Sequence, residues 1–334
     1  MSVELLNFIE TVLNGLMSGV MYSLVALGFV LIFKASGVFN FAQGVFALFA
    51  ALTLVGFQTG QIPFSHLINE LFGTNLHNWY PSLNSFLAIL LTIITMIILA
   101  WLVERLVLRH LVNQERIILF MATIGLAFVL EGVGDLMWGS DVKVLDVGIP
   151  SGGSIWLEEA TIGWASQGSE YYGMYIDVLN VWATLIAIIL VTALALFSQY
   201  TKTGRALRAV ADDHQAALSV GISLRSIWIL VWGISGFIAM VAGIMWGTES
   251  GVQFSLSLIA LKALPVLILG GFTSIPGAII GGLLIGVGEK LAEIYIGGLL
   301  DIGAIENWFA YVLALVFLLF RPQGLFGDKI IERV

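Results

Sequence analysis

Three charged residues lie inside apolar stretches of the sequence, where charge is rare. Glu131 and Asp135 are four residues apart in the segment 117–138, so a helix presents them on one face. Lys262 lies about six residues into the segment 256–271. A charge at membrane depth costs about 2.5–3.5 kcal/mol and normally faces a partner or a cavity. We therefore predict either an ion pair between Lys262 and one of the acids, or a polar lining of a solute path.

Asn40 and Gln43 are a second polar group, and they open the otherwise apolar segment 38–57. Being three residues apart, they share a face if this stretch is helical. One interpretation is helix capping and hydrogen bonding between helices, which amides commonly provide in membranes. The other is contact with a polar solute at a break in the helix. Both interpretations stay open, and a broken or re-entrant helix is predicted here.

Enzyme chemistry has little support in the rest of the chain. Gly132-Val-Gly-Asp135 matches a short motif of intramembrane aspartyl proteases, but that reaction needs a second intramembrane Asp, and the apolar segments contain none. Cys is absent, which excludes disulfides and thiolate nucleophiles. The four His residues lack the spacing of metal ligands, so no metal site is predicted. We expect a protein that is not an enzyme.

The composition is typical of a membrane protein rather than a soluble domain. Of the 334 residues, 59% are hydrophobic and 11% are charged, whereas soluble domains have about 45–50% apolar and about 25% charged residues. The net charge of −8 comes with no basic patch for phosphate groups, which excludes a nucleic-acid partner. We predict an all-α, polytopic helix bundle that contacts membrane lipid and forms one transmembrane domain over residues 1–334.

Apolar segments long enough to span a membrane must position the polar residues, and a helix crosses the hydrocarbon core with about 20 residues. The sequence contains about nine such segments, and a count of eight or ten would require one of them to be split or re-entrant. The segments are 8–33, 38–57, 85–103, 117–138, 178–198, 226–248, 256–271, 276–296 and 307–320.

The positive charges predict the orientation of these spans. With loops 104–116 and 199–225 and the C-terminal tail inside, 11 of the 14 basic residues lie in the cytoplasm. The outer loops then contain one basic residue, Lys143. The longest outer loops are 58–84, which mixes aromatic and polar residues as an interfacial amphipathic helix does, and 139–177. We predict a multi-pass protein with its N-terminus outside and its C-terminus in the cytoplasm.

Glycines recur at four-residue spacing, which lets helix backbones approach closely. Gly15 with Gly19, and Gly282 with Gly286, are two such pairs, and we predict that they pack helices together. Three charged residues near an outer helix end are expected at the membrane interface rather than in a functional site: Glu289, Lys290 and Glu293.

The loop 199–225 carries the most informative pattern in the chain. Its apolar residues fall at helical spacing and are Leu207, Val210, Ala211, Leu218 and Ile222. We predict a short helix over about 204–221 that stops at Gly221. Such a helix either rests on the membrane or docks in a groove of another protein. The loop by itself favours neither.

A family resemblance rests on this loop and on its wider context. Gln215-Ala216-Ala217, followed after three residues by Gly221, is similar to the motif by which ABC importer permeases dock on their ATPases. From about residue 13 to 327 the chain resembles the branched-chain amino-acid ABC importer permeases. The stretches that carry the resemblance are Asn40-Phe-Ala-Gln-Gly44, Ala122-Thr-Ile-Gly-Leu126, Gly204-Arg-Ala-Leu-Arg-Ala209, Gly270-Gly-Phe-Thr-Ser-Ile-Pro-Gly277 and Arg321-Pro-Gln-Gly-Leu-Phe326.

The resemblance implies a permease subunit of an ATP-driven importer for branched-chain or related small amino acids in a bacterial inner membrane. The implied partners are two ATPase subunits, a second permease protomer that is usually a different chain, and an extracytoplasmic solute-binding protein. This chain contains no phosphate-binding loop, so we expect it to hold no cofactor, while the partner ATPases use ATP and Mg. We assign the ATPase contact to Arg205, Arg208, Asp212, Asp213, Ala216, Ala217 and Gly221. We assign the solute path to Asn40, Gln43, Glu131, Asp135 and Lys262.

Two departures from the family pattern leave the solute open. Gln43-Gly44-Val45 stands where the family commonly has His and then Gly-Glu, and Gln215 replaces the usual acid. Relatives carry urea or short-chain amides, which are the alternative solutes. A secondary transporter or channel without ATPase partners is the alternative mechanism, and the docking motif disfavours it.

Overall fold

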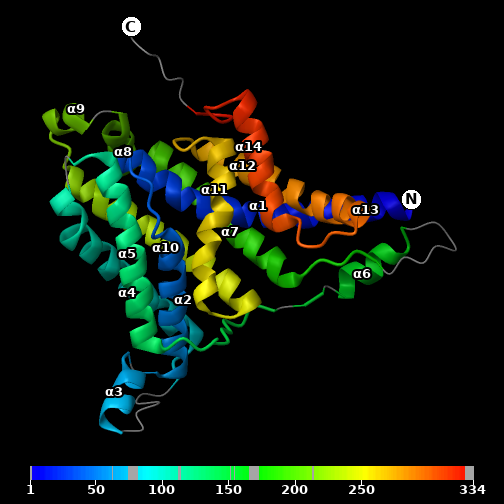
Figure 1. The fold of residues 1–334 in the computed structure, drawn as a ribbon, viewed down its shortest axis with the longest axis horizontal. Helices are drawn as coiled ribbons and strands as arrows, with labels where there is room; N and C mark the ends of the chain where they lie inside the picture. The colour runs from blue at the N-terminus through cyan, green and yellow to red at the C-terminus, as the bar shows by residue number, and fades with distance from the viewer. Residues whose placement is uncertain are drawn as a thin grey trace. The chain divides into compact units, whose positions relative to one another are not determined.

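The computed structural model describes residues 2–61, 63–73, 82–111, 114–150, 152–153, 155–164, 173–212 and 214–327. In these ranges the regular structure is helical, and β pairing is limited to isolated bridges, Lys143 with Val252 and Gly153 with Asp177. The predicted all-α fold class is confirmed. Figure 1 labels the α-helices, which are α1 (Val3–Ser36), α2 (Gln43–Thr59), α3 (Ser65–Phe72), α4 (Ser85–Leu106), α5 (Arg116–Trp138), α6 (Ile155–Ile162), α7 (Val178–Tyr200), α8 (Lys202–Asp212), α9 (His214–Ser219), α10 (Leu224–Ser250), α11 (Ile259–Gly270), α12 (Ile275–Leu291), α13 (Gly298–Leu300) and α14 (Glu306–Phe320).

The described helices coincide with the apolar segments of the sequence. Six stretches are long and apolar enough to cross a membrane, namely 3–36, 85–111, 117–138, 178–200, 224–250 and 275–300. Three shorter apolar helices cover 43–59, 254–270 and 306–320. Each of the nine predicted segments therefore corresponds to a helix, while the count of nine spans stays a prediction.

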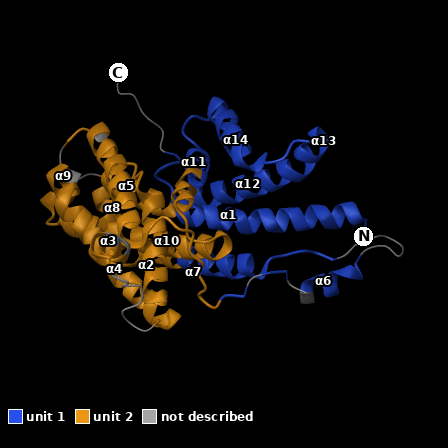
Figure 2. Cartoon of the chain, turned by 60° about the horizontal axis from the view of Figure 1, so that its bottom comes forward, with its two compact units in different colours: residues 1–26, 149–192, 262–334 blue, residues 27–148, 193–261 orange. Residues whose placement is uncertain are grey.

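The chain divides into two compact units, which Figure 2 colours separately. The long helices α1 and α7 and the shorter α11 each contribute residues to both. One transmembrane domain over residues 1–334 stays a prediction. The first unit comprises 1–26, 149–192 and 262–334, and the second comprises 27–148 and 193–261.

The core of the second unit is α2 packed against α10, with α4 and α5 beside them. Residues 43–56 of α2 are all buried, because this stretch is apolar on every side of the helix. α2 and α10 approach closely where a Cβ added to Gly243 would lie 2.2 Å from the Ala47 carbonyl oxygen. Phe46 packs edge-on against Trp232 at a ring-centroid distance of 5.8 Å. This packing fixes the first turn of α2, where Gln43 lies.

In the first unit, the N-terminal part of α1 packs against α12 through glycines. A Cβ added to Gly19 would lie 2.6 Å from the Gly282 carbonyl oxygen, and one added to Gly286 would lie 2.4 Å from the Gly15 carbonyl oxygen. Backbones this close leave no room for any side chain. The predicted packing role of both glycine pairs is confirmed.

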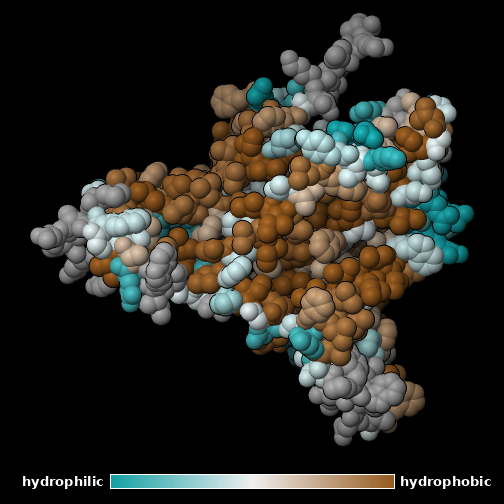
Figure 3. Space-filling view, turned by 180° about the vertical axis from the view of Figure 1, so that it is seen from behind, coloured by the Kyte–Doolittle hydropathy of each residue, from teal (hydrophilic) through white to brown (hydrophobic). Residues whose placement is uncertain are grey.

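Several apolar helix faces are exposed in the part of the chain that the structure describes. Figure 3 shows broad hydrophobic faces in brown. Much of α4, α5 and α7 is exposed, including the large side chains of Phe86, Phe128 and Ile189. Helices of this length with bare apolar surfaces are typical of contact with lipid or with another membrane subunit. In the loop 58–84, α3 is a short helix with the exposed apolar residue Phe72, and its place at a membrane interface stays a prediction.

Candidate functional site

Asn40 and Gln43 lie in the second unit, at a break between α1 and α2. α1 ends at Ser36, Gly37 adopts a left-handed φ of 68°, and α2 begins at Gln43. Asn40 Oδ1 accepts a hydrogen bond of 3.1 Å from the Ala42 backbone N–H. Asn40 Nδ2 donates one of 3.4 Å to Gln43 Oε1. The two amides thus hold the turn that joins the helices.

Ser235 of α10 completes this polar cluster. Its hydroxyl donates a hydrogen bond of 2.7 Å to Gln43 Oε1, and Gln43 Nε2 donates one of 3.2 Å to the Ser235 carbonyl oxygen. Asn40, Gln43 and Ser235 are all buried. Every polar side-chain atom of the two amides therefore has a partner inside the unit, as capping and interhelix hydrogen bonding require. Contact with a solute needs another conformation and stays a prediction.

Replacing Gln43 with methionine is expected to lower the free energy of unfolding by about 1–3 kcal/mol, because it removes the acceptor of the buried Asn40 Nδ2 group and leaves the Ser235 hydroxyl with the Gly28 carbonyl oxygen alone. The measurement is the thermal midpoint of the purified protein in detergent. The matched control is Thr53→Val, since among the described residues the Thr53 hydroxyl bonds only to the Phe49 carbonyl oxygen of its own helix, at 2.7 Å. An unchanged midpoint together with weakened solute uptake would instead favour the solute-contact interpretation.

The three charged residues first considered divide between the units. Glu131 and Asp135 lie in α5 of the second unit, where Glu131 is half-buried and Asp135 is exposed. Lys262 lies in α11, in the part that belongs to the first unit. An ion pair between Lys262 and either acid stays a prediction, as does their place in a solute path.

Lys262 has polar neighbours within its own unit. Its Nζ atom lies 5.8 Å from the centroid of the Tyr22 ring, a distance at which a cation and an aromatic face attract. Its charge also acts on the carboxylates of Glu289 in α12 and Glu306 in α14. Glu289 is 1% exposed and hydrogen-bonded to Tyr22, and its Oε2 atom has no hydrogen-bond partner among the described residues. Lys262 therefore supplies a counter-charge that a buried carboxylate needs.

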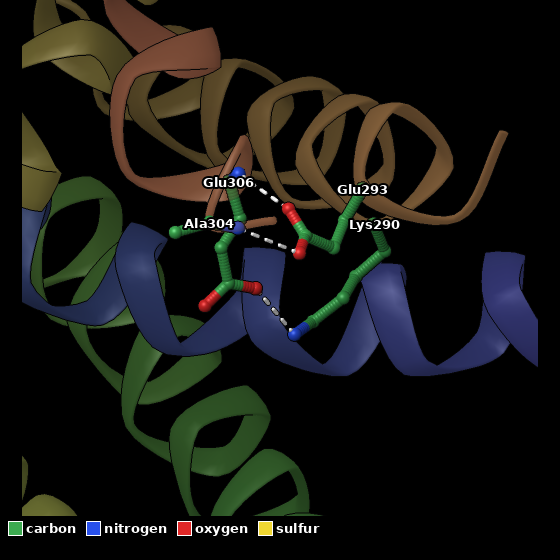
Figure 4. Close-up of polar contacts among 4 residues, drawn as sticks. All are labelled: Lys290, Glu293, Ala304 and Glu306. Atoms are coloured by element: carbon green, nitrogen blue, oxygen red, sulfur yellow. Dashed lines mark hydrogen bonds and ion pairs between the residues drawn. The ribbon is translucent and has the colours of Figure 1, made fainter. Parts of the chain in front are cut away.

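A second polar network joins the end of α12 to the start of α14 (Figure 4). The Lys290 Nζ and Glu306 Oε2 atoms are 2.8 Å apart. Glu293 accepts two backbone hydrogen bonds, of 3.1 Å from the Ala304 N–H and 2.9 Å from the Glu306 N–H. The Glu293 carboxylate thus caps α14, where N–H groups lack helical partners and negative charge is favourable.

The burial of Glu289 differs from its expected position at an interfacial helix end. The sequence does contain a signal for this burial, because Glu289 follows Gly282 and Gly286 by seven and three residues. That spacing puts it on the glycine face of α12, which packs against α1. Ser235 has no comparable signal, since an isolated serine in an apolar helix can bond to its own backbone.

The loop 199–225 is helical over the predicted stretch, as α8 and α9, and residue 213 between them lies outside the described residues. The turn from α7 into α8 is tight at Gly204, whose N–H donates a hydrogen bond of 2.9 Å to Thr201 Oγ1. A Cβ on Gly204 would lie 2.3 Å from the Phe197 carbonyl oxygen. The glycine therefore permits α8 to turn back on the end of α7.

The apolar pattern of this loop predicts only part of its burial. Leu207 and Val210 of α8 are buried, and α8 packs against α10. Leu218 of α9, which belongs to the predicted apolar face of the loop, is 53% exposed.

The predicted ATPase-contact residues occupy both exposed and buried positions. Those with exposed side chains are Arg205, Asp212 and Ala216. Arg208 is half-buried, and its Nη2 atom donates a hydrogen bond of 3.4 Å to the Gln199 carbonyl oxygen. Ala217 is 2% exposed and is buried by its own chain. Gly221 adopts a left-handed φ of 85° close to the predicted helix end, and Asp213 lies outside the described residues.

Comparison with known proteins decides the family. Residues 11–321 match the family described as branched-chain amino acid transport system / permease component. The chain belongs to this permease family. It is 28% identical to the high-affinity branched-chain amino acid transport system permease protein LivH of Escherichia coli (strain K12), over 100% of both chains. It is 27% identical to the corresponding permease protein BraD of Pseudomonas aeruginosa, over 99% of both chains.

Among solved structures, PsaBC from Streptococcus pneumoniae in complex with Fab resembles this permease with a TM-score of 0.44. The identity is 13%, and the match covers 93% of this chain and 91% of that chain. Across the described residues of the permease, no three His, Asp or Glu side chains are grouped so as to hold a metal ion. The family resemblance drawn from the motifs is confirmed.

Proposed function

We propose that this permease is the transmembrane subunit of an ATP-driven importer for branched-chain or related small amino acids. The observation that carries the proposal is the family match over residues 11–321, supported by full-length similarity to a protein named for branched-chain amino acid transport. Its partners are two ATPase subunits that use ATP and Mg, a second permease protomer and an extracytoplasmic solute-binding protein. The exposed apolar faces of α4, α5 and α7 offer surface for lipid and for the second protomer.

The loop 199–225 suits the transfer of motion from an ATPase to the spans. α8 begins two residues after α7 ends, and α10 begins five residues after α9 ends. Connections this short allow little independent movement of the helices that they join, since one residue spans at most about 3.6 Å. A displacement of α8 and α9 therefore pulls on α7 and α10 together.

Replacing Ala216 with tryptophan is expected to weaken co-purification of the ATPase subunits by about five- to a hundredfold. An oversized side chain in a packed interface costs about 1–3 kcal/mol, and the exposed position of Ala216 spares the fold of the permease. The second measurement is solute-stimulated ATP hydrolysis in vesicles. The control is Gln114→Trp, an exposed position in the loop 104–116. Wild-type values for both measurements would contradict the assignment of this loop and favour a transporter without ATPases.

We further propose that the N-terminus lies outside and the C-terminus in the cytoplasm of a bacterial inner membrane, in line with the charge bias. Lys143 is the one basic residue of the outer loops, and its Nζ atom donates a hydrogen bond of 3.3 Å to Gln61 Oε1. Burial lowers the pKa of Lys143, while the nearby charge of Asp141 acts in the opposite direction. A hydrogen bond to the loop 58–84 thus holds the one basic side chain that opposes the charge bias.

Single cysteines test this orientation, and the native chain contributes no background labelling because it has none. Ser140 in the loop 139–177 and Ser219 at the end of α9 are both exposed. A membrane-impermeant maleimide is expected to label Ser140→Cys in spheroplasts, and Ser219→Cys only after the membrane is permeabilised. The reverse pattern would invert the proposed topology.

A further inference from the structure

A pocket of about 510 Å³ lies in the second unit, next to the end of the loop 199–225. Its walls come from the end of α4, the helical turn after α4, the turn after α9 and the first residues of α10. The side chains that matter are Glu104, Arg109, Leu218, Ile222, Arg225 and Trp228. This volume is within the range of about 300–1,000 Å³ that is typical of small-molecule sites.

Glu104 is the unusual feature of this pocket. Its side chain is 3% exposed, and the Nε atom of Arg225 lies 3.6 Å from its Oε1 atom. That separation is longer than the roughly 2.7–2.9 Å of a good charge-assisted hydrogen bond. The other oxygen, Oε2, has no hydrogen-bond partner within the described part of the chain. A buried carboxylate in this state is stabilised by any second cationic donor that reaches it.

Basic side chains lie on the solvent-exposed side of the same pocket. Arg109 is exposed, and the Arg225 side chain is 51% exposed. α10 also begins here, with Ser223 as its N-cap, and the N-terminal end of a long helix adds partial positive charge. The pocket therefore has an acidic group at its buried end and basic groups near its mouth.

Apolar side chains line the same pocket. Leu218 is 53% exposed, and Ile222 is half-buried beside it in the turn after α9. Trp228 adds a largely buried indole, whose Nε1 atom has no hydrogen-bond partner among the residues that the structure describes. A ligand that fits must therefore combine a cationic group, an anionic group and a small apolar body.

We propose that this pocket binds a small apolar amino acid in its zwitterionic form. The ammonium group of the ligand pairs with Glu104, and its carboxylate pairs with Arg109 and Arg225. Its side chain packs on Leu218 and Ile222. A purely anionic ligand, such as a lipid phosphate, leaves Glu104 under-paired and places a like charge near it.

The position of the pocket gives the ligand a regulatory effect, which rests on the proposed function and orientation. Glu104 belongs to α4, whereas Leu218 and Ile222 belong to the loop that carries ATP-driven motion. A bound amino acid joins these two elements and favours the arrangement in which they lie together. The pocket faces the cytoplasm in the proposed orientation, so imported amino acid fills it and slows further transport.

The experiment uses the complete permease–ATPase complex in lipid nanodiscs, without the solute-binding protein, and L-leucine as the probe. Calorimetric titration is expected to detect binding, and saturating L-leucine is expected to lower the rate of ATP hydrolysis. Arg109→Gln and Glu104→Gln are each expected to weaken binding by about tenfold or more. Arg109 is exposed, so its variant keeps the test valid if Glu104→Gln fails to fold. The control is Arg105→Gln, because Arg105 lies 5.0 Å from the Trp101 ring centroid and does not line the pocket.

Two partial ligands separate a zwitterion site from an anion site. 4-Methylpentanoate lacks the ammonium group and isoamylamine lacks the carboxylate, and both are expected to bind at least about tenfold more weakly than L-leucine. Equal binding of 4-methylpentanoate, or L-leucine binding that neither variant changes, would overturn the proposal. ATP hydrolysis that is unaffected by bound L-leucine would overturn its regulatory part. Arg109-dependent binding in a complex that fails to import amino acids supports the pocket and contradicts the proposed function instead.

Discussion

Gly286→Ala is expected to destabilise the first unit by about 3 kcal/mol or more, the upper end of the range for overpacking. The added methyl group would lie 2.4 Å from both the Gly15 carbonyl oxygen and the Gly19 amide nitrogen. These are backbone atoms of α1, which cannot rotate away as a side chain can. Relief requires the two helices to separate along their glycine face. The measurements are the yield of monodisperse protein in detergent and its thermal midpoint.

Gly132→Ala is the matched control for this prediction. Gly132 also lies within an apolar helix, α5, but a Cβ there meets nothing within 4 Å. Alanine at this position is expected to be neutral or slightly stabilising, because glycine lowers helix stability by about 1 kcal/mol. Equal thermal midpoints for Gly286→Ala and Gly132→Ala would show that α1 and α12 do not approach as closely as described.

Lys262→Met is expected to lower the free energy of unfolding by about 1–3 kcal/mol, because it removes one of the two lysine charges that act on the buried Glu289 carboxylate, the other being that of Lys290. The charge left behind is that of Glu289, which is buried and whose Oε2 atom already has no hydrogen-bond partner among the described residues. Adding Glu289→Gln to Lys262→Met is expected to restore most of the loss. The measurement is a double-mutant cycle on thermal midpoints, with solute uptake measured in parallel.

The same cycle decides between the two candidate partners of Lys262. If Glu131→Gln restores the stability of Lys262→Met and Glu289→Gln does not, the predicted pair with α5 is correct and the pairing with Glu289 is wrong. The control is Lys202→Met, since the Lys202 side chain is exposed at the start of α8. Its removal is expected to change the free energy of unfolding by about 0.5 kcal/mol or less.

The sequence by itself determined the helical class and the location of the helices. The nine apolar segments and the described helices coincide because hydropathy is a local property, which any lipid-exposed or fully buried helix must satisfy. The glycine pairs at positions 15, 19, 282 and 286 were also informative, since four-residue spacing has one main structural use in apolar helices. The family was determined in the same way, by motifs whose order along the chain is their signal.

The sequence was less informative where an outcome depends on which helices meet. Asn40 and Gln43 were compatible with either helix capping or solute contact. Only the tertiary structure shows that Ser235 of α10 hydrogen-bonds to Gln43, so that both amides have partners inside the unit. Leu218 fits the apolar period of the loop, yet it is 53% exposed, because burial depends on which helices pack beside the loop.

The charged residues show most clearly which features the sequence determines and which depend on the tertiary structure. That Lys262 needs a partner follows from the free energy of a charge in an apolar segment, which the sequence alone predicts. Its neighbours Tyr22 and Glu289 are 240 and 27 residues away along the chain, and only the packing of α1 and α12 places them beside it. Burial of Glu104 and its incomplete pairing with Arg225 are likewise products of the tertiary structure. Local composition determines whether a charge must be compensated, whereas the packing of distant helices determines which atoms compensate it.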